Sequence, residues 1–149
     1  MTAPDRDALV DELADAPRRI ALAARTADRS SAPVPAGEWT AAEVVRHLIS
    51  VERVVWQPRI DRMLAEDEPA WAWTEPGPDE ATAGLPLEDV LGAFATAREA
   101  TLARVRGLDD AGWARVGVHA TYGRLAVADL LTVARDHDEE HLEGLAERG

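Results

Sequence analysis

The chain has 149 residues and a formal net charge of −12, from 28 acidic residues against 16 arginines and no lysine. This charge repels phosphate backbones and anionic membrane surfaces, so we expect no nucleic-acid or membrane partner. The absence of cysteine excludes disulfides and thiolate ligands, and with no signal-peptide pattern and no apolar run of about 20 residues we expect one cytoplasmic domain, residues 1–149.

Apolar residues recur at three- and four-residue spacing in four segments. This pattern predicts an all-α protein, a four-helix bundle with a long crossover between the second and third helices. We expect the first helix at about residues 5–26, kinked at Pro17. The second should begin at the capping box Thr40-Ala41-Ala42-Glu43 and continue, bent at Pro58, to about residue 65.

The second half of the chain contains the two longest predicted connections. Residues 66–85 are rich in proline and should form the crossover, a long ordered loop of the kind that often covers a site. The third helix should span residues 86–107, ending at Gly107, and the fourth residues 125–148. Between them, residues 113–123 are predicted to be irregular.

Three of the four histidines fall on core-facing sides of the second and fourth predicted helices. His137 and His141 are four residues apart, so on a helix they lie one turn above each other on one face. His47 lies on the apolar stripe of the second helix. Three imidazoles from two helices can hold a divalent transition metal and leave coordination positions open. The alternative is a set of hydrogen-bonded core histidines, which we disfavour because burying three unpartnered imidazoles is costly.

Several residues near the histidines have two interpretations. Asp138 can orient a ligand or act as a base, but we favour a solvated charged face. Glu52 is either a partner of the site or half of an exposed ion pair with Arg53 or Arg59. We expect His119 to be an exposed loop residue rather than a fourth ligand.

Aromatic and basic residues raise two further expectations. Trp71 and Trp73 are expected to close the end of the bundle rather than contact substrate. The acidic chain would repel a negatively charged reactant unless arginines lie near the mouth of the site, and the candidates are Arg46, Arg53 and Arg135.

Two segments resemble the DinB-like (DinB/YfiT-like) metalloenzyme family. The stretch from Glu38 to Leu48, with Glu52, resembles the family's second-helix motif. The stretch from Tyr122 to Leu131, followed by His137-Asp138-Glu139-Glu140-His141-Leu142, resembles its last-helix motif. The resemblance implies a four-helix bundle with a divalent metal, zinc or nickel preferred, on His47, His137 and His141. Many members dimerise, which implies a homodimer.

The same resemblance favours a metal-dependent transferase. Similar proteins include thiol S-transferases and relatives of mycothiol-dependent maleylpyruvate isomerase, so the expected cofactors are the metal and a low-molecular-weight thiol such as mycothiol, acting on a small-molecule substrate. Two alternatives remain open. One is a metal-dependent hydrolase using the same ligands. The other is a non-catalytic bundle that binds metal or a small ligand.

Overall fold

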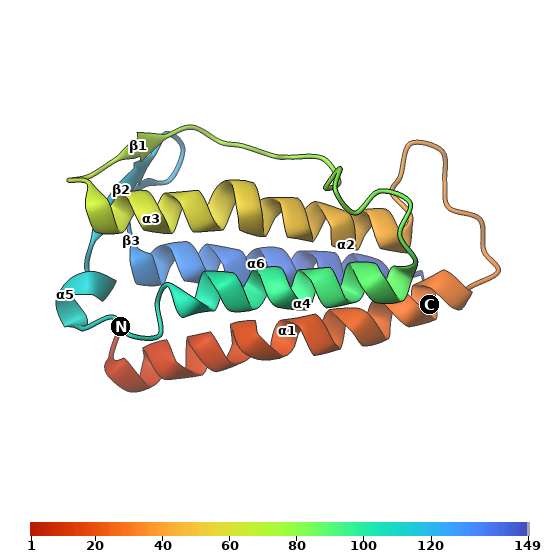
Figure 1. Ribbon diagram of the computed structural model, residues 1–149, viewed down its shortest axis with the longest axis horizontal. Coiled ribbons are helices and arrows are strands. Elements are labelled where there is room, and N and C mark those ends of the chain that lie inside the picture. The colour runs from red at the N-terminus through yellow and green to blue at the C-terminus, as the bar shows by residue number, and fades with distance from the viewer. Residues whose placement is uncertain (149) are drawn as a thin grey trace.

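In the computed structural model, which describes residues 1–148, long helices pack side by side and a small sheet covers one end of them (Figure 1). The helices are α1 (Ala3–Arg29), α2 (Ala41–Ser50), the π-helix η1 (Val51–Trp56), α3 (Gln57–Ala65), α4 (Leu87–Ala103), α5 (Asp110–Trp113) and α6 (Val127–Ala146). The strands are β1 (Ala70–Trp71), β2 (Val116–His119) and β3 (Gly123–Ala126). Within the described residues, no helix is long and apolar enough to cross a membrane.

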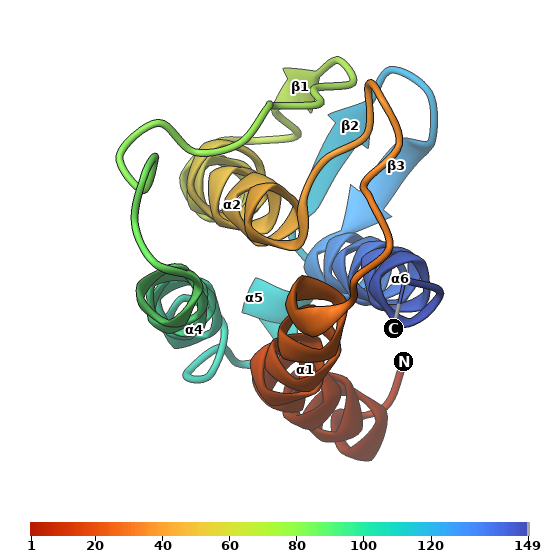
Figure 2. The ribbon, with the colours of Figure 1, turned by 90° about the vertical axis from the view of Figure 1, so that its right-hand side faces the viewer.

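The long helices form a bundle with paired directions. Helices α1 and α6 run one way, whereas α4 and the continuous path α2–η1–α3 run the other way (Figure 1). Seen down the bundle, α4 and α6 flank α1, and α2 lies opposite α1 (Figure 2). The connection between α3 and α4 must therefore return along the bundle, which confirms the predicted crossover.

The expectation of a purely helical chain is wrong at one end of the bundle. Strands β2 and β3 form an antiparallel hairpin, and β1 from the crossover pairs with β2 in parallel. The segment 113–123, predicted to be irregular, contains most of this hairpin. Strands of two to four residues are too short to show a period of two in the sequence, and β1 pairs with a segment more than 40 residues away.

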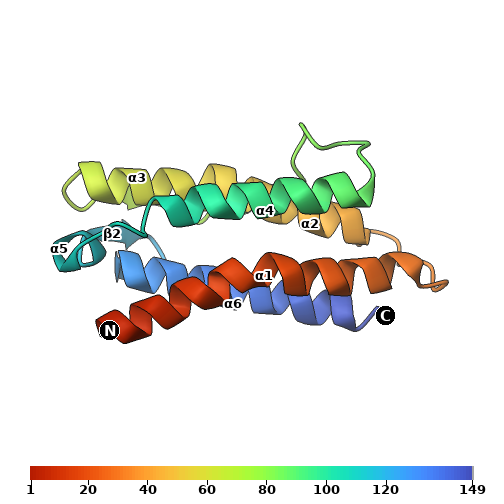
Figure 3. The ribbon, with the colours of Figure 1, turned by 60° about the horizontal axis from the view of Figure 1, so that its bottom comes forward.

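Helix α1 begins at Ala3, two residues before the predicted start, and it bends near the predicted proline. Thr2 caps the N-terminus in a capping box with Asp5. Pro17 lies inside the helix, which changes direction near its middle (Figure 3). Because proline has no N–H, the carbonyl of Leu13 has no helical donor four residues later. That carbonyl instead accepts a hydrogen bond from Nη1 of Arg98 in α4, at 2.9 Å.

The second helical path also begins at its predicted cap. The backbone N–H of Thr40 donates to Glu43 Oε1 (3.0 Å), and the N–H of Glu43 donates to Thr40 Oγ1 (3.2 Å). Where the sequence predicts a bend at Pro58, the path contains the π-helix η1, which ends two residues before this proline. A proline ring clashes with the carbonyl four residues before it, and the wider π turn relieves that clash.

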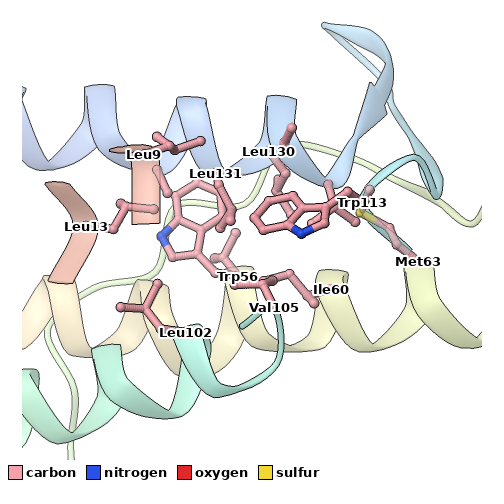
Figure 4. Close-up of a cluster of buried hydrophobic side chains, with 14 of the residues drawn as sticks. Leu9, Leu13, Trp56, Ile60, Met63, Leu102, Val105, Trp113, Leu130 and Leu131 are labelled. Carbon is pink, nitrogen blue, oxygen red and sulfur yellow. The ribbon is translucent and has the colours of Figure 1, made fainter. Parts of the chain in front are cut away.

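The buried apolar residues fall into two clusters along the bundle. One cluster, near the sheet, contains Trp56 packed among Leu13, Leu102 and Leu131 (Figure 4). The other lies toward the opposite end and contains Ile49, Phe94 and Leu145 among others. Between the two clusters lies a layer of buried charged side chains, namely Glu52 of η1, Arg98 of α4 and Asp138 of α6.

Candidate metal site and its cavity

The structure brings His47 from α2 together with His137 and His141 from α6. Nε2 of His137 lies 3.4 Å from Nε2 of His47 and 3.2 Å from Nε2 of His141, and one ring nitrogen from each residue lies within 4.8 Å of the others. Zinc binds imidazole nitrogen at about 2.0–2.1 Å, so tetrahedral geometry places two such ligand atoms about 3.3 Å apart. The spacing of these nitrogens therefore fits one divalent ion.

The crossover fixes the tautomer of His47. Its Nδ1 lies 2.7 Å from the carbonyl oxygen of Pro76, which can only accept a hydrogen bond, so the ring proton lies on Nδ1. Nε2 is then left with its lone pair directed at His137. The ring of Trp39 also packs against the His47 ring, with centroids 4.7 Å apart. A histidine held in this way is pre-oriented as a metal ligand.

Burial keeps all three histidines neutral at pH 7. It lowers the pKa of His47, and the hydrogen bond to Pro76 offsets only part of this effect. Burial and the neighbouring imidazoles lower the pKa of His137 to about 3. Burial and His47 lower that of His141 to about 4. Metal binding requires neutral imidazole, so each residue has the protonation state of a ligand.

The histidines form part of the wall of a cavity of about 220 Å³. Its other walls come from η1, α3, α6 and the crossover, namely Val51, Val55, Trp56, Arg59, Trp73, Thr74, Glu75, Pro76 and Glu140. The crossover therefore covers the site, as its length and composition predicted. A small molecule in this cavity would lie directly against the three imidazoles.

A buried ion-pair cluster lies behind the histidines. Arg98 of α4 contacts Glu52 at 2.7 Å and Asp138 at 2.8 Å, and all three side chains are almost completely buried. The expectation of a solvated Asp138 is thus wrong, and Glu52 pairs with Arg98 rather than in an exposed ion pair. Burial acts to lower the pKa of Arg98, but the two carboxylates hold it above its ordinary value. Burial raises the pKa of Asp138 to about 6 even though Arg98 opposes this shift.

Two buried arginines, Arg98 and Arg59, were not predicted to be buried, although their positions in the sequence indicate it. Arg98 lies four residues after Phe94 and four before Leu102, on the apolar stripe of α4. Arg59 likewise lies four residues from both Val55 and Met63, and it is buried in the cavity wall. An arginine at a core position of an amphipathic helix predicts a buried partner or ligand, because its charge is never lost.

Other expected positions turn out differently. His119 is buried in β2, where its Nδ1 accepts hydrogen bonds from the N–H groups of Thr121 and Tyr122, so it is neither exposed nor part of the three-histidine cluster. Trp73 lines the cavity instead of closing the bundle. The arginines considered for the mouth do not line it: Arg46 and Arg53 contact Asp79, and Arg135 contacts acidic residues on the surface.

The fold and site define a helical bundle with a three-histidine cluster in the wall of a cavity. The chain matches the DinB superfamily over residues 4–145 and belongs to it. Among solved structures, it is similar to YfiT from Bacillus subtilis, with a TM-score of 0.77, 21% identity, and coverage of 99% of this chain and 87% of that one. YfiT is described as a probable metal-dependent hydrolase with an unusual four-helix bundle topology. Curated proteins give no match to this chain.

Proposed function

We propose that this protein is a metal-dependent enzyme that uses a divalent transition metal held by His47, His137 and His141. The observation that carries the proposal is the convergence of three neutral imidazole nitrogens, 3.2 and 3.4 Å apart, at the wall of a cavity. Three ligands leave coordination positions for a reactant, as in catalytic rather than structural sites. Zinc and nickel both suit this donor set.

The remaining residues prepare the cavity for a small-molecule substrate. Pro76 fixes the tautomer of His47, and the Arg98 cluster joins the helices that carry the histidines. Apolar side chains of η1 and the exposed ring of Trp73 line one side of the cavity. A bound divalent ion would act there as a Lewis acid that activates a thiol or water as the nucleophile at neutral pH.

For the reaction itself, we propose transfer of a low-molecular-weight thiol such as mycothiol to an electrophile. The chain has no cysteine, so the thiol must come from a second substrate. Hydrolysis is the second candidate, supported by the description of YfiT and by Glu140 and Glu75, which line the cavity near the histidines and can accept a proton from water. Thiol consumption that depends on the electrophile separates the two reactions.

The experiment that tests the proposal measures metal content by elemental mass spectrometry. We expect about one zinc or nickel ion per chain in the untagged protein and almost none in His137→Ala. His119→Asn is the matched control, because it changes a buried histidine outside the cluster and should retain the metal. A wild-type protein that takes up neither metal after reconstitution would rule the proposal out.

A further inference from the structure

Arg59 is a buried arginine that no carboxylate neutralises. Its side chain is only 8% exposed, and its single hydrogen bond runs from Nη2 to the carbonyl oxygen of Ala72, at 3.0 Å. A guanidinium has five N–H donors, so most of its capacity is unused. The guanidinium also lies over the ring of Trp71, 5.2 Å from the centroid, which fixes its position.

Comparison with the other arginines sets Arg59 apart. Among the described residues, only Arg29, Arg46 and Arg59 have no carboxylate within 4.0 Å. Arg29 is exposed, and Arg46 donates two hydrogen bonds to the carbonyl of Asp79. Arg59 is thus the one that combines burial with an unneutralised charge. Burying such a charge is unfavourable unless a ligand completes its interactions.

The charges in the cavity are segregated. Glu75 and Glu140 are exposed and act electrostatically on the histidines, so they lie at the metal-site end. Arg59 lies twelve residues after His47 along the helical path, beside Trp71 of the sheet. Apolar side chains of η1, namely Val51, Val55 and Trp56, line the wall of the same cavity.

We propose that Arg59 is a subsite for the carboxylate of a small, otherwise apolar acid, whose other end faces His47, His137 and His141. The planar guanidinium matches a carboxylate in a two-pronged hydrogen bond. The apolar walls suit an uncharged body, and the cavity of about 220 Å³ limits the ligand to a small one. The proposal rests on the proposed function for what happens at the histidine end, but binding at Arg59 requires no metal.

The test measures binding of phenylacetate and of its neutral analogue phenylacetamide to the metal-free protein, by protein-observed NMR titration at pH 7. We expect phenylacetate to bind at least tenfold more tightly than the amide, since only the carboxylate can form a charge-assisted, two-pronged hydrogen bond with the guanidinium. In Arg59→Gln, the affinity for phenylacetate should fall to that for the amide. Arg29→Gln removes the same charge from the surface and should leave both affinities unchanged.

The design separates a damaged cavity from a lost subsite. Unchanged amide binding in Arg59→Gln shows that the cavity is intact, and Arg59→Lys, which keeps the charge but not the planar fork, should retain part of the preference for the acid. If Arg59→Gln did not fold, the relative affinities of Arg59→Lys and of the wild-type protein for phenylacetate and phenylacetamide would still test the subsite.

Three results would overturn the subsite. They are no binding of phenylacetate at millimolar concentrations, equal wild-type affinities for acid and amide, and a preference that survives Arg59→Gln but disappears in His137→Ala. The last result would place the carboxylate on the histidines. Conversely, a wild-type protein that prefers the acid yet takes up no metal would contradict the proposed function and leave the subsite standing.

Discussion

Arg98 supplies the positive charge that neutralises the two buried carboxylates of Glu52 and Asp138. It donates to Glu52, to Asp138 and to the carbonyl of Leu13 that Pro17 leaves without a helical donor. A proline inside α1 and an arginine inside α4 are each unfavourable alone. Together they complete each other's hydrogen bonds, so each explains why the other is tolerated.

Replacing Arg98 should strongly destabilise the protein. Arg98→Gln leaves two buried carboxylates without their counter-charge, and we expect a loss of about 3–5 kcal/mol in the free energy of unfolding, measured by urea denaturation. Arg104→Gln, one residue beyond the end of the same helix, removes a partly exposed pair with Asp61 and should cost at most about 1 kcal/mol. Similar losses in the two variants would contradict the assigned role of Arg98.

The residues of the candidate site differed in how visible they were in the sequence. His137 and His141 could be paired from their spacing alone, and His47 from its place on an apolar stripe. Glu52 and Asp138 could not be assigned, because the arginine that neutralises both comes from a different helix whose register the sequence does not specify. The Pro76 carbonyl was equally inaccessible, since it belongs to a connection without a repeating pattern.

Among the elements, the sheet depends on close contact between Trp71 of β1 and Gly117 of β2. A Cβ atom built on Gly117 would lie 2.0 Å from the Trp71 ring. The ring therefore needs a glycine beneath it, and it is the same ring on which the Arg59 guanidinium stacks. The small sheet thus positions one wall of the cavity.

Two glycine-to-alanine substitutions should have opposite effects on stability. Gly117→Ala must displace the Trp71 ring, and we expect a loss of about 1–3 kcal/mol. Gly92→Ala, at an exposed position of α4, places a Cβ that meets no atom within 4 Å and should gain about 0.5–1 kcal/mol from helix propensity. Urea denaturation followed by circular dichroism measures both. A neutral Gly117→Ala would show that the ring can move freely.

The elements with strong local signals were predicted well. A capping box located the start of the second path, and apolar periodicity gave the four long helical segments. Helix α4 ends at Ala103, four residues before the glycine expected to stop it. The π-helix was missed because Pro58 alone already accounted for an irregularity of the helix at this point. The sheet was missed because it depends on pairing between segments that are distant in the sequence.

For the molecule as a whole, the metal-free protein should lose stability in acid. The pKa values of His137 (about 3) and His141 (about 4) lie below the ordinary value of 6.5, and that of His47 is also lowered. Below about pH 6.5 these histidines take up protons in the unfolded chain but not in the folded protein. The free energy of unfolding, at its full value above that pH, therefore falls progressively toward pH 4. Asp138, whose pKa is raised to about 6, acts in the opposite direction, but it is one group against three.

Urea denaturation at pH 7.5 and pH 5, with a chelator present, checks this expectation. The free energy of unfolding should be lower at pH 5, and the difference should shrink in a His137→Asn, His141→Asn double variant. A wild-type protein equally stable at both pH values would mean that these imidazoles are not buried as described.

The position of Arg98 also has a consequence for how the bundle unfolds. Its partners lie on α1, η1 and α6, so its charge and hydrogen bonds are satisfied only when all the long helices are docked. In any partly unfolded form in which one helix detaches, a charge or hydrogen-bonding group of this cluster loses its partner, and this raises the free energy of that form. Unfolding should therefore be cooperative, with slow amide hydrogen exchange in all four long helical segments governed by one global opening.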